Sequence, residues 1–141
     1  MTQMAAKSIS DKNTTSPRRI LVMDDDANLR YIYRQALHQA GYEVHLAATI
    51  QEARSLLEAI EFDVFLGDTH LEGRHRGADL LREQIDTLIQ KGTRILMLSS
   101  HTHYRSICEE MGVNMFVEKP VGINRLVTLV DRLAAERGEQ A

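Results

Sequence analysis

The chain has 141 residues, the length of one compact domain, and its 43% hydrophobic and 26% charged residues exclude disorder throughout. A net charge of −3 gives no reason to expect direct nucleic-acid binding, the single cysteine (Cys108) excludes an internal disulfide, and no apolar run is long enough to span a membrane. We therefore expect a soluble cytoplasmic protein that binds neither nucleic acid nor membrane.

Residues 1–17 are rich in Ser, Thr, Lys and Asn, show no sustained periodicity and end at Pro17. This composition predicts a flexible N-terminal tail. One domain is predicted over residues 18–136, followed by a short C-terminal tail at 137–141.

From Arg18 onward, short apolar runs alternate with stretches whose apolar residues recur every three or four positions. Thr49, with Glu52 three residues later, resembles a helix-starting capping box, and Gly41, Gly92 and Gly112 follow the ends of three amphipathic stretches. The pattern predicts, in chain order, a strand at 20–23, a helix at 29–40, a strand at 44–46, a helix at 49–60, a strand at 62–66, a helix at 81–89, a strand at 95–98, a helix at 104–111, a strand at 115–117 and a helix at 123–133.

Five strands that alternate with five helices predict an α/β fold. Parallel strands need crossover connections, and right-handed crossovers place helices on both faces of the sheet, so we expect a doubly wound (βα)5 three-layer sandwich with a five-stranded parallel sheet. Functional groups in such folds lie beyond the carboxyl ends of the strands. The residues that follow the first, third, fourth and fifth predicted strands should therefore converge; they are Asp24, Asp25, Asp68, Ser99 and Lys119.

These residue types suit one kind of chemistry. Carboxylates held close together raise one another's pKa unless a cation compensates, and Mg²⁺ accepts carboxylate and phosphate oxygens. A lysine can pair first with a carboxylate and then with a phosphoryl oxygen, and a serine hydroxyl can donate to another phosphoryl oxygen. The set predicts a site for phosphoryl transfer to an aspartate.

Four segments resemble the signatures of response-regulator receiver domains, the phosphoacceptor domains of two-component signalling. They are 20–26 (ILVMDDD), 63–68 (DVFLGD), 97–100 (MLSS) and 117–120 (VEKP), and they occur in the order that the family shows. The resemblance extends from residue 18 to about residue 135. It implies the flavodoxin-like strand order 2-1-3-4-5.

The resemblance also implies the phosphorylated residue and the metal ligands. Asp68 matches the phosphorylated aspartate. Asp25 matches the aspartate that binds Mg²⁺ directly, and Asp24 matches the one that acts through a bound water. His70, two residues after Asp68, matches the position whose backbone carbonyl binds the metal.

Three further matches concern the response to phosphorylation. Ser99 matches the switch hydroxyl that moves toward the phosphoryl group, and Phe116 matches the switch aromatic that rotates inward on activation. Lys119 matches the family's active-site lysine, and the pattern implies a cis peptide bond before Pro120.

Two departures from the family pattern lie next to Asp68 in the sequence. The loop from Leu71 to Gly77 lacks the usual proline and is about one residue longer, which leaves its shape open. Gly67 stands where many relatives carry a larger apolar residue, so we expect either a small cavity or a larger neighbour there.

Two histidines occupy positions that, by the resemblance, flank the route by which water reaches the acyl phosphate. His70 lies two residues after Asp68, and His101 lies two residues after the switch serine. One hypothesis is that they tune the lifetime of phosphorylated Asp68; the alternative is that they are exposed loop residues. With His75 or His103 they could instead bind a transition metal.

The resemblance implies a signalling switch that accepts a phosphoryl group from a sensor histidine kinase or a histidine phosphotransfer protein. Such a domain is not an enzyme acting on other molecules, since it catalyses only its own phosphorylation and dephosphorylation. Phosphorylation is expected to alter the surface formed by the fourth helix, the fifth strand and the fifth helix, where an output partner or a second copy can bind. The output partner is unknown, or the chain is the receiver portion of a longer protein.

Two other functions stay open from the sequence. A pseudo-receiver would act only by binding partners; the complete acidic and lysine set argues against it, and the unusual loop favours it. An aspartate-nucleophile phosphatase of the haloacid-dehalogenase type needs a second Asp where this chain has His70. Neither a Walker-type loop nor a Gly-x-Gly-x-x-Gly turn follows the first strand, which argues against nucleotide binding.

Overall fold

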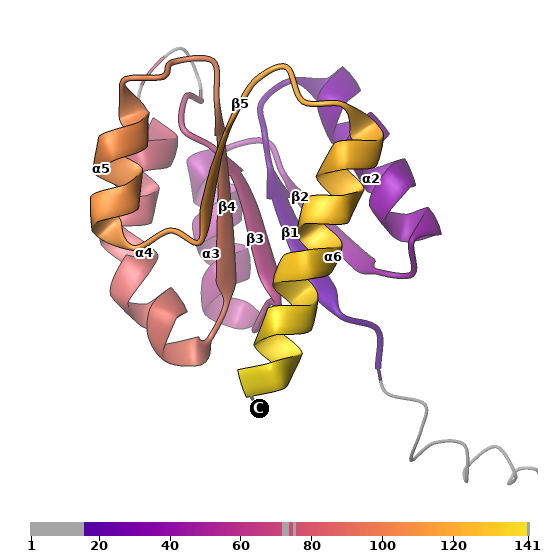
Figure 1. Ribbon diagram of the computed structural model, residues 1–141. Coiled ribbons are helices and arrows are strands. Elements are labelled where there is room, and N and C mark those ends of the chain that lie inside the picture. The colour runs from indigo at the N-terminus through magenta and orange to yellow at the C-terminus, as the bar shows by residue number, and fades with distance from the viewer. Residues whose placement is uncertain (1–15, 72–73, 75, 141) are drawn as a thin grey trace, which may run out of the picture.

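The structure is a computed structural model that describes residues 16–71, 74 and 76–140. Most of the predicted N-terminal tail, part of the loop after Leu71 and the last residue lie outside the described residues. Five parallel strands form one sheet in the order β2-β1-β3-β4-β5, which confirms the predicted fold class and strand order (Figure 1). The strands are β1 (Arg19–Met23), β2 (Glu43–Ala47), β3 (Val64–Asp68), β4 (Arg94–Ser99) and β5 (Met115–Glu118).

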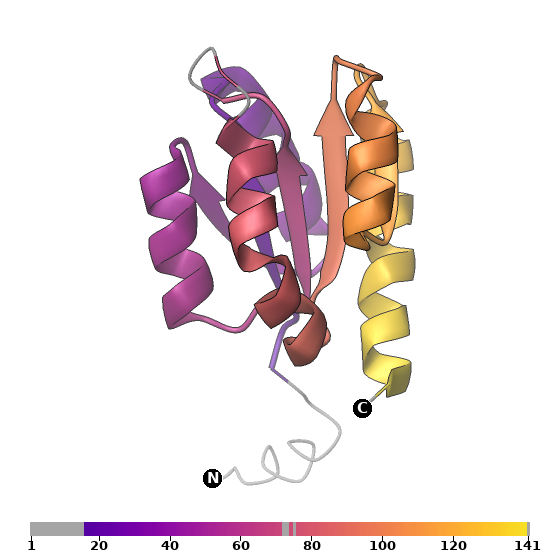
Figure 2. The same cartoon turned by 90° about the vertical axis from the view of Figure 1, so that its left-hand side faces the viewer.

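Helices cover both faces of the sheet. Figures 1 and 2 show α2 and α6 on one face and α3, α4 and α5 on the other. Among the residues that the structure describes, no helix is both long and apolar enough to cross a membrane. The helices are α2 (Ala27–Gln39), α3 (Ile50–Ala59), α4 (Arg76–Lys91), α5 (Tyr104–Met111) and α6 (Ile123–Gln140).

The central strands separate two apolar cores. Along β1, Ile20 and Val22 pack toward α2 and α6, whereas Leu21 and Met23 pack toward α3, α4 and α5. Successive side chains of a strand point to opposite faces, so a strand covered on both sides needs an unbroken apolar run. The half-buried β2 lies at the edge of the sheet, as the strand order implied by the resemblance requires.

The helix ends follow the predicted signals. Thr49 caps α3 by accepting a hydrogen bond from the backbone N–H of Glu52 (3.1 Å). The glycines after α2, α4 and α5 adopt positive φ values of 102°, 77° and 102°, respectively, as residues that end a helix in the left-handed conformation do.

Several element boundaries differ from the predictions. β3 covers Val64–Asp68, not 62–66, because its pairing with β1 begins at Val64. Helix α4 begins at Arg76, before the first apolar residue of the predicted stripe. Ile89, assigned to that apolar stripe, is 52% exposed, so the buried stripe of α4 ends at Leu88.

The end of α6 also differs from the prediction, because the helix continues to Gln140 where a C-terminal tail was predicted at 137–141. The reason is Arg137. Its guanidinium donates to Asp63 Oδ1 (2.7 Å) and to the backbone carbonyl of Lys91 (2.9 Å), and it also pairs with Glu61. These contacts fix the last turns of α6 to the amino-terminal edge of the sheet.

Replacing Arg137 with alanine should lower the free energy of unfolding by about 1–3 kcal/mol, because it leaves the half-buried Asp63 carboxylate with fewer hydrogen bonds. Arg132→Ala, at an exposed position of the same helix, is the matched control and should change stability little. Urea denaturation of both variants measures the difference. Equal midpoints for the two variants would contradict the anchoring role of Arg137.

Candidate functional site

Lys119 brings two strand ends together at the carboxyl edge of the sheet. Asp24 follows β1, Asp68 is the last residue of β3, and Lys119 follows β5. The Lys119 ammonium lies 2.9 Å from Asp24 Oδ2 and 2.9 Å from Asp68 Oδ2. Asp24 is 1% exposed and Asp68 is 6% exposed, so one ammonium group bridges two buried carboxylates.

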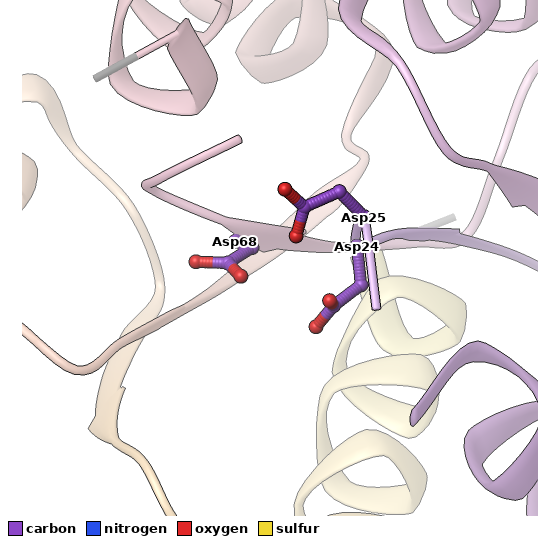
Figure 3. Close-up of side chains that lie close together, drawn as sticks. All are labelled: Asp24, Asp25 and Asp68. Carbon is purple, nitrogen blue, oxygen red and sulfur yellow. The ribbon is translucent and has the colours of Figure 1, made fainter. Parts of the chain in front are cut away.

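Asp25 completes an acidic cluster with these two residues. One carboxylate oxygen of each of Asp24, Asp25 and Asp68 lies within 4.8 Å of the others. Figure 3 shows Asp24 and Asp25 on the same turn of chain, with Asp68 beside them. Asp25 is exposed, and the cluster opens into a cleft of about 410 Å³. The cleft is lined by Asp24, Asp25, Asp26, Leu29, Asp68, His70, Ser100, His101 and Lys119.

Each buried carboxylate is oriented from two sides. Asp24 Oδ1 accepts the backbone N–H of Asp26 (2.9 Å), and Asp68 Oδ1 accepts the backbone N–H of His70 (3.1 Å). The other oxygen of each carboxylate accepts a hydrogen bond from Lys119. Because neighbouring backbone groups hold one oxygen, the second one is presented to the ammonium group and the cleft.

The electrostatics of the site follow from burial and this bridge. Burial raises the pKa of the Asp68 carboxyl, against the hydrogen bonds from Lys119 and His70. Burial lowers the pKa of the Lys119 ammonium, but the hydrogen bonds to Asp24 and Asp68 outweigh it and leave that pKa above its ordinary value. Lys119 therefore stays charged at neutral pH, and three carboxylates face one ammonium group.

This excess of carboxylates suits a hard divalent cation. Mg²⁺ binds through one or two carboxylates and keeps several waters, so it needs a charged site that is partly open to solvent. The exposed Asp25 and the buried Asp24 and Asp68 supply such a set of oxygen donors beside a cleft. The residues present therefore fit the metal that the sequence predicted.

Ser99 lies at the end of β4, but it does not line the cleft. Its side chain is fully buried. Its hydroxyl accepts hydrogen bonds from Thr69 Oγ1 (2.7 Å) and from the backbone N–H of His101 (2.9 Å), and it donates to the His101 carbonyl (3.0 Å). Sequence reasoning did not find Thr69, because a single threonine after an apolar strand gives no signal of its own.

The remaining predicted residues are Phe116 and the histidines. Phe116 is buried in β5, and the Arg105 guanidinium carbon lies 4.9 Å from the centroid of its ring. The ring centroids of His70 and His101 lie 4.9 Å apart, and those of His101 and His103 lie 5.7 Å apart. His75, which was considered with them as a metal ligand, lies outside the described residues.

Two glycines near Asp68 play different parts. A Cβ atom on Gly77 would lie 1.8 Å from the backbone oxygen of Asp68, so the first turn of α4 packs directly against the Asp68 backbone. A Cβ on Gly67 would meet only side chains, among them the sulfur of Met97 at 3.2 Å. Larger neighbours therefore occupy the space beside Gly67, which was one of the two outcomes expected there.

The fold and the strand-end site together define a receiver domain. The family model of the response regulator receiver domain matches residues 20–131, so the chain belongs to this family of two-component signalling domains. The peptide bond between Lys119 and Pro120 is cis, as the resemblance implied.

Curated relatives are longer than this chain. It is 31% identical over 122 residues to the DNA-binding transcriptional regulator NtrC of Bradyrhizobium sp. (strain RP501 Parasponia), covering 86% of this chain and 25% of that protein. It is 27% identical over 122 residues to the protein PetR of Rhodobacter capsulatus, covering 85% of this chain and 50% of PetR. The chain thus spans a quarter to a half of these two relatives.

Solved structures show the same fold over nearly the whole domain. A CheY-like response regulator receiver domain protein from Methanospirillum hungatei JF-1 matches with a TM-score of 0.81 and 26% identity, covering 89% of this chain and 100% of that one. The response regulator TrrA from Thermotoga maritima, in complex with Mg²⁺-BeF, matches with a TM-score of 0.71 and 28% identity, covering 82% of this chain and 98% of that one.

Proposed function

We propose that this receiver domain accepts a phosphoryl group on Asp68 from the phosphohistidine of a sensor histidine kinase or a histidine phosphotransfer protein. The observation that carries the proposal is the bridge from Lys119 to two buried carboxylates, Asp24 and Asp68, beside the exposed Asp25. Asp68 attacks the phosphorus atom and forms an O–P bond. The P–N bond of the donor histidine breaks, and its electron pair stays on the imidazole.

The side chains of Asp24, Asp25 and Asp68, with the backbone carbonyl of His70, would hold Mg²⁺. When bound, this ion neutralises negative charge on the carboxylates and on the transferring phosphoryl group. Lys119 supplies a fixed positive charge, because its two hydrogen bonds hold the ammonium beside Asp68 before the donor arrives. The proposal draws support from TrrA, which was solved with Mg²⁺-BeF.

Phosphorylation would act on the rest of the domain through Ser99 and Phe116. Ser99 would leave its present partners and donate to a phosphoryl oxygen, and the ring of Phe116 would follow toward the space vacated. These two residues lie on β4 and β5, so the change would reach the surface formed by α5, β5 and α6 (Figure 1). An output partner, an output domain or a second copy of the chain would bind there.

Incubation with acetyl phosphate and Mg²⁺ tests the function directly. Intact-protein mass spectrometry should show one added phosphoryl group, which alkaline hydroxylamine removes because it is an acyl phosphate. The same mixture with EDTA should show none. Protein that stays unmodified with Mg²⁺ present would contradict the proposal and leave a module that acts only by binding partners.

His70 and His101 would lengthen the lifetime of the acyl phosphate. Both line the cleft, and their rings lie 4.9 Å apart at its rim, where they can shield the phosphorus from water. We expect the His70→Ala, His101→Ala double variant to lose its phosphoryl group several-fold faster than the wild type, measured by mass spectrometry after removal of the donor. His103→Ala, whose ring neighbours His101 but does not line the cleft, should keep the wild-type rate.

A further inference from the structure

A buried hydrogen bond joins two hydroxyl groups beside the candidate site. Thr69 and Ser99 are both fully buried, and Thr69 Oγ1 lies 2.7 Å from Ser99 Oγ. Thr69 follows Asp68 directly in the chain, and Ser99 is the last residue of the neighbouring strand β4. The contact therefore links the segment that carries the nucleophile to the predicted switch residue.

The Ser99 hydroxyl has no free hydrogen-bonding capacity in this arrangement. A serine hydroxyl has one proton to donate and two lone pairs. The proton goes to the His101 carbonyl (3.0 Å), and the lone pairs accept from the His101 N–H (2.9 Å) and from Thr69 (2.7 Å). Because Ser99 has only this one proton, it can donate to a phosphoryl oxygen only after its bond to the His101 carbonyl breaks and the hydroxyl turns away from its present partners.

Thr69 is itself held in place by its backbone. Its N–H donates to the carbonyl of Leu98 (3.0 Å), and its carbonyl accepts from the N–H of Ala78 at the start of α4 (3.2 Å). The threonine therefore lies fixed between β4 and α4, and its hydroxyl meets Ser99 from a constant direction.

We propose that Thr69 is a positioning residue that holds the Ser99 hydroxyl in its resting orientation and thereby lowers the affinity of the site for a phosphoryl group. This inference rests on the proposed function. In the resting state the Thr69–Ser99 bond is made, and in the phosphoryl-bound state it is lost. Without the Thr69 hydroxyl, the site has no such hydrogen bond to lose when it binds the phosphoryl group.

The Thr69→Val variant keeps the shape of the side chain and deletes the hydroxyl. Its resting state leaves a Ser99 lone pair unsatisfied in a buried position, which destabilises that state relative to the bound one. A net hydrogen bond is worth about 0.5–1.5 kcal/mol, so beryllofluoride in the presence of Mg²⁺ should bind roughly 2- to 10-fold more tightly to the variant.

The test compares apparent dissociation constants for beryllofluoride with Mg²⁺, measured by ¹⁹F NMR, in five proteins. They are the wild type, Thr69→Val, Thr69→Ser, Ser99→Ala and the double variant that combines Thr69→Val with Ser99→Ala. The single variant Ser99→Ala is the reference for the double variant. Thr69→Ser keeps the hydroxyl and should bind within about twofold of the wild type. In the Ser99→Ala background, Thr69→Val should have no further effect, because the bond is already absent.

The outcomes separate this inference from the function on which it rests. A wild type that binds no beryllofluoride would overturn the proposed function. A wild type that binds, with Thr69→Val equal to it or weaker, would overturn only the role of Thr69. Should Thr69→Val not fold, Thr69→Ala replaces it, with the same expected tightening and the same contrary result.

Discussion

The Asp68→Asn variant should bind no beryllofluoride at Mg²⁺ concentrations that saturate the wild type. Beryllofluoride mimics a phosphoryl group by bonding to a carboxylate oxygen, and the amide of asparagine is too weak a nucleophile to replace it. The substitution also removes one of the three carboxylates that would hold the metal. The change is close to isosteric, so the full loss of binding would be chemical in origin.

The matched control is Asp86→Asn, the same change at an exposed position of α4, which should bind as the wild type does. Folding is checked by thermal denaturation in EDTA. Because burial raises the pKa of Asp68, the folded wild type loses stability as the pH rises through that raised value. Asparagine does not ionise, so the variant does not lose stability in this way as the pH rises. At pH 7 its melting temperature should therefore be no lower than that of the wild type. Retained binding in a folded Asp68→Asn protein would mean that another residue accepts the group.

The Gly77→Ala substitution should damage both the fold and the site. Its Cβ would lie 1.8 Å from the backbone oxygen of Asp68 and 2.9 Å from the carbonyl carbon of Thr69. Both atoms belong to backbone at a strand end, so they cannot rotate away as the tip of a side chain can. We expect a loss of about 3 kcal/mol in the free energy of unfolding, together with weaker beryllofluoride binding, because α4 or the Asp68 backbone has to move.

Two other glycines provide the comparison. A Cβ on Gly122, just before α6, meets no heavy atom within 4 Å, and a Cβ on Gly67 meets only the ends of side chains. Gly122→Ala should leave stability and binding unchanged, and Gly67→Ala should cost less stability than Gly77→Ala. Urea denaturation measures the stability of the three variants, and ¹⁹F NMR measures their beryllofluoride binding. If Gly77→Ala behaves like Gly122→Ala, the contact between α4 and Asp68 does not constrain the site.

The sequence predicted the parallel sheet and the gathering of Asp24, Asp68 and Lys119 because both depend on simple regularities. The carboxyl ends of parallel strands meet at one edge of the sheet, so a residue that directly follows an apolar strand lies at that edge. The family resemblance added the strand order and the roles expected of these residues. These features are local in sequence, even though the groups meet from distant segments.

The sequence could not predict contacts that depend on how whole elements approach one another. Thr69 and Gly77 are ordinary residues until β4 and α4 are placed against them, and the guanidinium of Arg137 finds Asp63 only after α6 crosses the sheet. The start of α4 was predicted late for a related reason. Its first turn carries Arg76 and Gly77, which give no apolar periodicity, and packing against Asp68 fixes the turn.

One ammonium group serves two carboxylates, and this sharing makes Asp24 and Asp68 a single electrostatic unit. When Asp24 is neutralised, Lys119 is left wholly to Asp68, whose pKa is no longer raised by the Asp24 charge. Changes in free energy caused by substitutions at the two positions will therefore not add, and the reactivity proposed for Asp68 depends on all three residues.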